Sequence, residues 1–188
     1  MTKYLLFSLL VLLATSCGDD DGPVIENEEE LITELVYTLT PTGSATGRVQ
    51  LVFNDPDGDG GVAPIQQVTG PLIAGTTYQG TLTITNRSDP SVTIDVADEI
   101  RDEAEDHLFF YIPDQGLDVT VSYADADANG APLGLETVLT AGEASTGTLE
   151  LILRHEPDKN AAGVDIETPA GAGGETDIAV TWSVTVRN

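Results

Sequence analysis

Asp177-Ile-Ala-Val-Thr-Trp-Ser-Val-Thr-Val186 closes the chain by alternating apolar residues with small or polar ones. Successive side chains of a β-strand point to opposite faces, so this pattern predicts a strand with one buried face. The residues expected on that face are Ile178, Val180, Trp182, Val184 and Val186. Trp182 is therefore expected in the hydrophobic core.

Shorter stretches with the same alternation precede this strand, at residues 35–40, 49–53, 78–85 and 117–123. Turn-forming residues separate them, as in the Pro- and Gly-containing segment 41–47. Many short strands joined by such turns are typical of an antiparallel β-sandwich. We therefore expect a mainly β chain with that architecture.

One segment has helical periodicity instead. Residues 95–106 contain neither Gly nor Pro, and Val96, Ile100 and Ala104 are spaced four apart. This spacing forms one apolar stripe on a helix of about three turns. Asp95 is positioned to cap its N-terminus. His107 would end the helix, and residues 107–112 are expected to lead back into a strand.

The two halves of the chain echo each other, which predicts a duplicated β unit, residues 31–106 and 107–188. An acidic loop follows a strand in each half, and the Ala-Gly turn, the Gly-Thr-Leu strand and an Arg-x-x-Pro segment recur in the same order. A chance echo among short strands with common turn residues is the alternative.

The second acidic loop matches the calcium-binding pattern of EF-hand loops. Asp125, Asp127 and Asn129 supply oxygens at alternate positions, Gly130 follows, and Glu136 stands at position twelve. Calcium prefers such hard oxygen ligands around one centre. The flanks are strands, so the resemblance concerns the loop alone. Asp, Asn and Gly are also the residues that β-turns need, and this leaves a plain turn as the alternative.

The first acidic loop carries a weaker version of the same pattern. Asp55, Asp57 and Asp59 alternate before Gly60, but Gln66 occupies position twelve. Calcium is therefore the expected cofactor of both loops, with the second as the stronger site.

Only two histidines occur in the chain, and they suggest a different site. His107 follows Glu103 by four residues, which places both on one helical face, and His155 lies in the second half. If the halves pack as a sandwich, the histidines and Glu103 could bind zinc or copper. A helix-end histidine interacting with carboxylates is the structural alternative.

Charge and composition exclude several classes of function. With 7 basic and 32 acidic residues the formal charge is −25, which argues against nucleic-acid binding. No catalytic motif with a nucleophile and an oriented base is present, so we do not expect an enzyme.

The N-terminus predicts an exported lipoprotein. Residues 1–16 resemble a lipoprotein signal peptide, with Lys3 before an apolar run too short to span a bilayer. Cys17, the only cysteine, is the expected lipidation site. Residues 17–30 form an acidic tether, and residues 31–188 the β domain. An ordinary secretory signal is the alternative.

The acidic residues after Cys17, together with Glu105-Asp-His-Leu-Phe-Phe-Tyr111 and Leu153-Arg-His-Glu-Pro157, resemble a family of uncharacterised Bacteroidetes-type lipoproteins. The resemblance implies an outer-membrane location, with the protein exposed on the cell surface or facing the periplasm. It implies no activity. We expect an envelope binding module that engages an extracellular ligand or an outer-membrane receptor. A transition-metal carrier and a purely structural surface lipoprotein are the alternatives.

Overall fold

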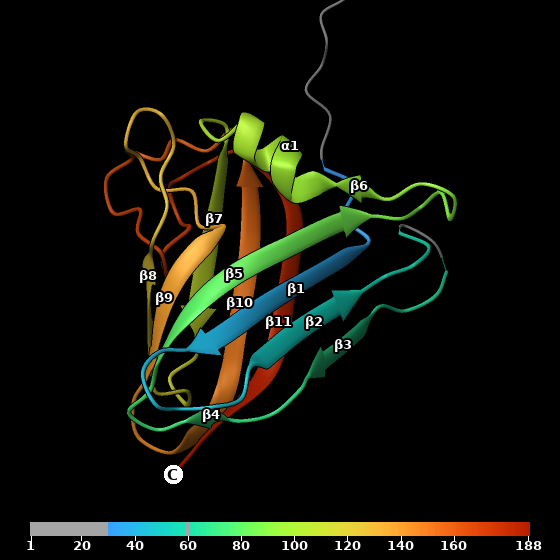
Figure 1. Ribbon diagram of the computed structural model, residues 1–188. Coiled ribbons are helices and arrows are strands. Elements are labelled where there is room, and N and C mark those ends of the chain that lie inside the picture. Colours follow the sequence, from blue (N-terminus) through green and yellow to red (C-terminus); the bar gives the residue numbers. More distant parts are fainter. Residues whose placement is uncertain (1–29, 59–60) are drawn as a thin grey trace, which may run out of the picture.

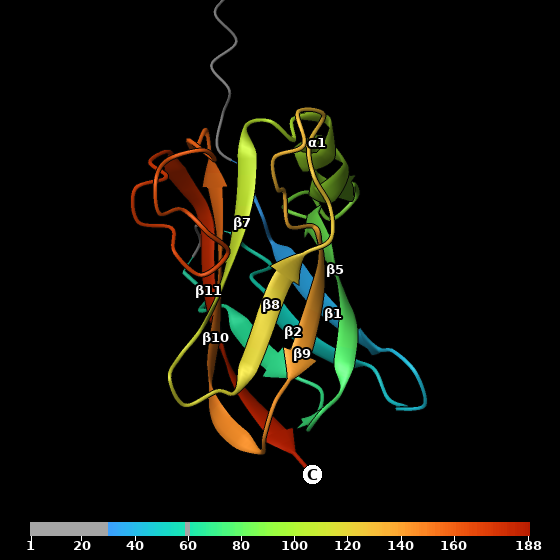
Figure 2. The ribbon, with the colours of Figure 1, turned by 90° about the vertical axis from the view of Figure 1, so that its left-hand side faces the viewer.

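The alternating strands form two mainly antiparallel sheets that pack face to face (Figures 1 and 2). The computed structural model describes residues 30–58 and 61–188. The signal peptide, Cys17, most of the tether and Asp59 lie outside these residues. Within the described part of the chain, the mainly β prediction is confirmed.

The larger sheet has seven strands among the described residues, in the order β3-β2-β1-β5-β9-β8, with β6 paired to β5. Its strands are β1 (Glu34–Pro41), β2 (Val49–Asn54), β3 (Ile65–Val68), β5 (Thr77–Asn86), β6 (Ile94–Asp95), β8 (Val119–Tyr123) and β9 (Glu136–Ala141). Strands from both halves of the chain build this sheet. The boundary between the sheets therefore does not coincide with the predicted boundary between repeats, and the duplication stays a prediction.

The smaller sheet has four strands in the same described part, in the order β4-β11-β10-β7. They are β4 (Leu72–Ile73), β7 (His107–Pro113), β10 (Ser145–His155) and β11 (Glu175–Arg187). The pairing of β4 with β11 is parallel, whereas β10 pairs antiparallel with β7 and β11. The start of β7, the end of β10 and the start of β11 therefore meet at one end of the sandwich.

The core lies between the sheets and follows the predicted alternation. Trp182 is 2% exposed, and its indole Nε1 donates a hydrogen bond to the carbonyl of Val52 in the opposite sheet, at 2.9 Å. The other four predicted residues of β11 are also buried. On the outer face of the smaller sheet, Leu108 and Phe110 pack against Ala172 from the loop before β11.

The helix is shorter than predicted. α1 (Val96–Asp102) begins at the expected cap, where the Asp95 side chain accepts a hydrogen bond from the Asp98 amide. It ends at Asp102, with Glu103 as its C-cap, instead of reaching residue 106. Acidic residues follow at the negative end of the helix dipole, where they are unfavourable. The chain instead turns into β7, which brings α1 to the end of the sandwich where β7 begins (Figure 1).

Candidate metal centre

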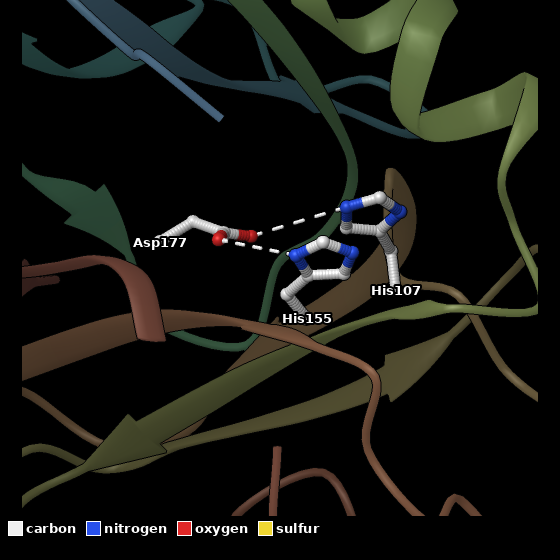
Figure 3. Close-up of side chains that lie close together, drawn as sticks. All are labelled: His107, His155 and Asp177. Carbon is white, nitrogen blue, oxygen red and sulfur yellow. Dashed lines mark ion pairs between the residues drawn. The ribbon is translucent and has the colours of Figure 1, made fainter. Parts of the chain in front are cut away.

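The two histidines lie side by side at the end of the sandwich next to α1. His107 is the first residue of β7, His155 is the last residue of β10, and the two are direct partners in the sheet register. Their side chains are 0% and 6% exposed. The rings stack with centroids 4.8 Å apart and planes 7° apart (Figure 3). The structure thus places side by side two histidines whose separation the sequence left open.

Asp177 completes a group of three and was not among the predicted ligands. In the pairing of β10 with β11, Leu153 is opposite Ile178 and Arg154 is opposite Thr176, so the register skips Asp177. Such a bulge redirects a side chain that regular alternation would place on the other face. The Asp177 side chain is 0% exposed and faces both rings, with Oδ2 3.9 Å from His107 Nε2 and Oδ1 3.9 Å from His155 Nδ1 (Figure 3).

The hydrogen bond at the other side of the His107 ring fixes its tautomer. Nδ1 lies 3.1 Å from the main-chain carbonyl oxygen of Glu103, which can only accept, so Nδ1 carries the proton. Burial lowers the pKa of His107, with a further contribution from neighbouring His155, which keeps the ring neutral. Nε2 then presents a lone pair. This nitrogen is buried and forms no hydrogen bond with any described residue.

Glu30 approaches the same nitrogen from the segment before β1. Its Oε1 lies 3.9 Å from His107 Nε2, and its side chain is 13% exposed. Burial, followed by repulsion from Glu99, Asp177 and Glu103, raises the pKa of Glu30 to about 7. Glu103, the predicted carboxylate partner, has an exposed side chain that also belongs to this neighbourhood.

These residues form two overlapping groups with spacing suited to a metal ion. The ligand atoms of His107, His155 and Asp177 lie within 4.8 Å of one another, as do those of Glu30, Glu103 and His107. Two ligands on one tetrahedral zinc ion are roughly 3.4 Å apart, given bonds of about 2.1 Å. A small contraction of the observed cluster therefore reaches bonding distances.

Metal binding also requires the rings to turn. An imidazole nitrogen binds a metal along its lone pair, which lies in the ring plane, and two nearly parallel stacked planes do not meet at one point. A single ion bound to both rings therefore requires rotation of at least one ring from the 7° arrangement. The Nδ1 hydrogen bond of His107 to a carbonyl is the usual second contact of a metal-bound histidine.

The backbone around His155 is held in a demanding conformation. Glu156 has φ 51°, and among the described residues it is the only non-glycine residue with a positive φ. Its amide donates a 2.6 Å hydrogen bond to the carbonyl of Asp106, which joins the end of β10 to the start of β7. At Gly174 a Cβ atom would overlap the carbonyl oxygen of His155. This close approach positions the start of β11, and with it Asp177.

The second acidic loop uses its carboxylates for its own backbone. Asp125 accepts hydrogen bonds from the amides of Gly134 and Glu136, at 2.7 and 2.9 Å. Asp127 Oδ1 accepts from the amides of Asn129 and Ala131, at 2.9 Å each. The side chains of Asn129 and Glu136 belong to exposed residues. These contacts favour the alternative in which the loop residues form a turn.

A lysine supplies the positive charge in this loop. Lys159 Nζ, on a side chain only 4% exposed, lies 2.9 Å from Asp127 Oδ2 and donates to the carbonyls of Pro132 and Ala104. Burial alone would raise the pKa of Asp127, but the hydrogen bonds from Lys159 and the backbone lower it. Calcium ligation by Asp127 would require the ammonium group to leave, so the calcium prediction gains no support here.

The first acidic loop lies beside the histidine cluster. Asp57 Oδ2 accepts a hydrogen bond from the Val62 amide at 3.1 Å. The Oδ1 atom of Asp55 is buried and forms no hydrogen bond with the described residues. Asp55 lines a cavity of about 260 Å³ together with Glu30 and Asp177. The calcium prediction for this loop remains untested, because Asp59 lies outside the described residues.

The sequence proposed His107, His155 and Glu103 as candidate ligands and did not include Asp177 or Glu30, which the structure places beside them. A β-bulge has no reliable sequence signal, and regular alternation assigns Asp177 to the face opposite Ile178. Glu30 is one of several glutamates in an acidic stretch, and nothing distinguishes it from its neighbours.

Comparison with protein-family models, with curated protein sequences and with solved structures found no match. The resemblance to Bacteroidetes-type lipoproteins therefore rests on the sequence motifs alone. Across residues 30–58 and 61–188, no helix is long and apolar enough to cross a membrane.

Proposed function

We propose that this protein is an envelope metal-binding module that holds a zinc or copper ion between His107, His155, Asp177 and Glu30. The location in the envelope, through acylated Cys17, is part of the proposal and rests on the N-terminal sequence. Imidazole nitrogens combined with carboxylate oxygens are typical ligands of zinc and copper.

The observation that carries the proposal is the surroundings of His107 Nε2. The nitrogen carries a lone pair, is fully buried, and faces Glu30 and Asp177 at 3.9 Å each. The nitrogen receives no donated hydrogen bond from the described residues. A buried lone pair without a donor is costly unless a cation lies beside it. A divalent metal ion at this position would have His107 Nε2 and the neighbouring carboxylate oxygens as its ligands.

Calcium at the first acidic loop is the second candidate. The observation in its favour is the buried Oδ1 atom of Asp55, which forms no hydrogen bond with the described residues. Calcium would select carboxylates and carbonyls over imidazoles, so its binding would be insensitive to the histidines. The same experiment therefore separates the two candidates.

The test is a binding titration of the full chain in mild detergent with zinc, copper and calcium in turn. The chain carries Cys17→Ser, so that the single thiol cannot bind the metal. We expect one zinc or copper ion per chain, and loss of that binding in His107→Ala/His155→Ala. Glu175→Gln, on the same strand as Asp177 but exposed, serves as the matched control and should bind normally.

Both histidines are buried, so replacing them with alanine can also disturb folding. Asp177→Asn is therefore a second variant, because it removes a proposed ligand and preserves side-chain shape. Circular dichroism checks that each variant is folded. Equal zinc or copper binding by the wild type, by His107→Ala/His155→Ala and by Asp177→Asn would refute the histidine-centred site. A calcium response that survives loss of the histidines would instead support the second candidate.

A further inference from the structure

The ligands of the proposed metal centre differ sharply in how firmly they are held. His107, His155 and Asp177 come from three hydrogen-bonded neighbouring strands, and their side chains are 0%, 6% and 0% exposed. Glu30 precedes β1, belongs to no strand, and is 13% exposed. Three ligands are thus fixed by the sheet, and the fourth sits on a segment without such restraint.

A cavity borders the less restrained side of the centre, where Glu30 lies. It has a volume of about 260 Å³, far more than the ~15 Å³ that one water molecule requires. Glu30, Asp55 and Asp177 line it together with apolar residues that include Leu31 and Phe53. A hydrated cation therefore fits in the cavity, next to two of the proposed ligands.

Asp55 is positioned to attract that cation. Its amide donates a hydrogen bond to the Thr33 carbonyl at 2.7 Å, and its carbonyl accepts one from the Gly58 amide at 3.3 Å. These bonds fix the backbone, while the buried Oδ1 atom forms no hydrogen bond with the described residues. A concave surface lined by charges of one sign concentrates counter-ions and raises their association rate.

The carboxylates alone would not define a site. The independent observation is the buried Nε2 atom of His107, which is aimed at Glu30 and Asp177 and forms no hydrogen bond with any described residue. This nitrogen provides a ligand for a cation that has reached the carboxylates. Glu30 and Asp177 thus border both the cavity and the His107 ring.

We propose that the centre is built for reversible loading, with the metal ion entering and leaving through the cavity of Glu30, Asp55 and Asp177, and with Glu30 as the exchangeable ligand. On release, the bond between the metal and Glu30 breaks and a water molecule from the cavity takes its place. The oxidation state of the metal is unchanged. This inference rests on the proposed function and extends it from binding to metal transfer.

The test measures rate constants as well as affinity. Rapid mixing of the full Cys17→Ser chain with zinc gives the association rate, and mixing of the loaded chain with excess chelator gives the dissociation rate. Glu30→Gln should raise the dissociation rate about tenfold and weaken the affinity in proportion. Asp55→Asn should slow association by about three- to tenfold and leave the dissociation rate within about twofold, so that the affinity weakens in proportion, as expected for loss of one steering charge.

Asp57→Asn is the matched control, because Asp57 lies in the same loop but its carboxylate bonds the Val62 amide and does not line the cavity. It should leave both rate constants within about twofold of the wild type. If zinc binding depends on the histidines but neither Glu30→Gln nor Asp55→Asn changes a rate, the loading route is refuted and the binding function stands. If the wild-type chain binds neither zinc nor copper, both proposals fail.

Discussion

His107 and His155 stand directly opposite each other on β7 and β10, with ring planes 7° apart. Burial, together with the neighbouring His155, lowers the pKa of His107 and favours a neutral His107 ring. A metal ion shared by both rings would require at least one of them to rotate out of the stack. The protonation of each nitrogen is therefore the most direct property to measure.

The His107 ring should carry its proton on Nδ1, because this nitrogen donates to the Glu103 carbonyl. Long-range proton–nitrogen NMR spectra of the chelator-treated protein should show an unprotonated Nε2, and only two histidines need to be assigned. Zinc should shift the Nε2 resonance and leave Nδ1 protonated. An Nε2-protonated ring in the metal-free protein would contradict the assignment.

Asp177→Asn should abolish the stabilisation of the protein by zinc, because the variant replaces a proposed carboxylate ligand with a neutral amide. With zinc at a hundred times its dissociation constant, only the wild type should gain about 2.7 kcal/mol. Thermal melts in chelator and in zinc measure the gain of each protein, with Glu175→Gln as the exposed control. A variant that gains as much stability from zinc as the wild type would contradict this prediction.

Lys159→Met should destabilise the fold through the second acidic loop. The change leaves Asp127 and two carbonyls without their buried ammonium partner, and loss of one member of a buried pair costs about 3–5 kcal/mol. Arg101→Met removes the exposed ion pair with Asp98 and should cost less than about 1 kcal/mol. Urea unfolding compares the two. Equal losses of stability in the two variants would mean that the buried ion pair of Lys159 contributes no more to stability than the exposed pair of Arg101.

The same loop should lose stability in acid. The folded-state pKa of Asp127 lies below the unfolded value of about 3.9, so the folded protein binds fewer protons in this range. The contribution of Asp127 is therefore fully present above about pH 5 and declines as the pH falls through the folded pKa. The difference in free energy of unfolding between wild type and Asp127→Asn should shrink between about pH 5 and pH 2. A constant difference over that range would contradict the assignment.

Alternation of apolar and polar residues predicted most of the strands, because burial of one sheet face requires an apolar side chain at every second position. It correctly placed Trp182 in the core and the alternating segments 35–40 and 49–53 in strands. The acidic loops illustrate the limit of such patterns. Local spacing is the same for a turn and for a calcium loop, and the contact that favours the turn comes from Lys159, which is 32 residues from Asp127. Asp177 was missed because its orientation depends on a register shift against another strand.

Gly80 provides a test of the larger sheet that is independent of the metal centre. It lies on β5 between β1 and β9, opposite Leu39 and Thr137. Above it, the Tyr37 hydroxyl and Thr137 Oγ1 form a 2.6 Å hydrogen bond that crosses β5, and a Cβ atom at Gly80 would overlap both oxygens. The glycine is thus needed for lack of a side chain, and not for an unusual φ.

Gly80→Ala should therefore destabilise the protein by about 1–3 kcal/mol through overpacking. Gly70→Ala, where a Cβ atom meets nothing within 4 Å, should change stability by less than about 0.5 kcal/mol. Denaturant unfolding of both variants in chelator gives the comparison. Because the hydrogen bond belongs to the larger sheet and both histidines to the smaller one, the zinc affinity of folded Gly80→Ala should match that of the wild type. Equal stability of the two alanine variants would show that Tyr37 moves aside at little cost.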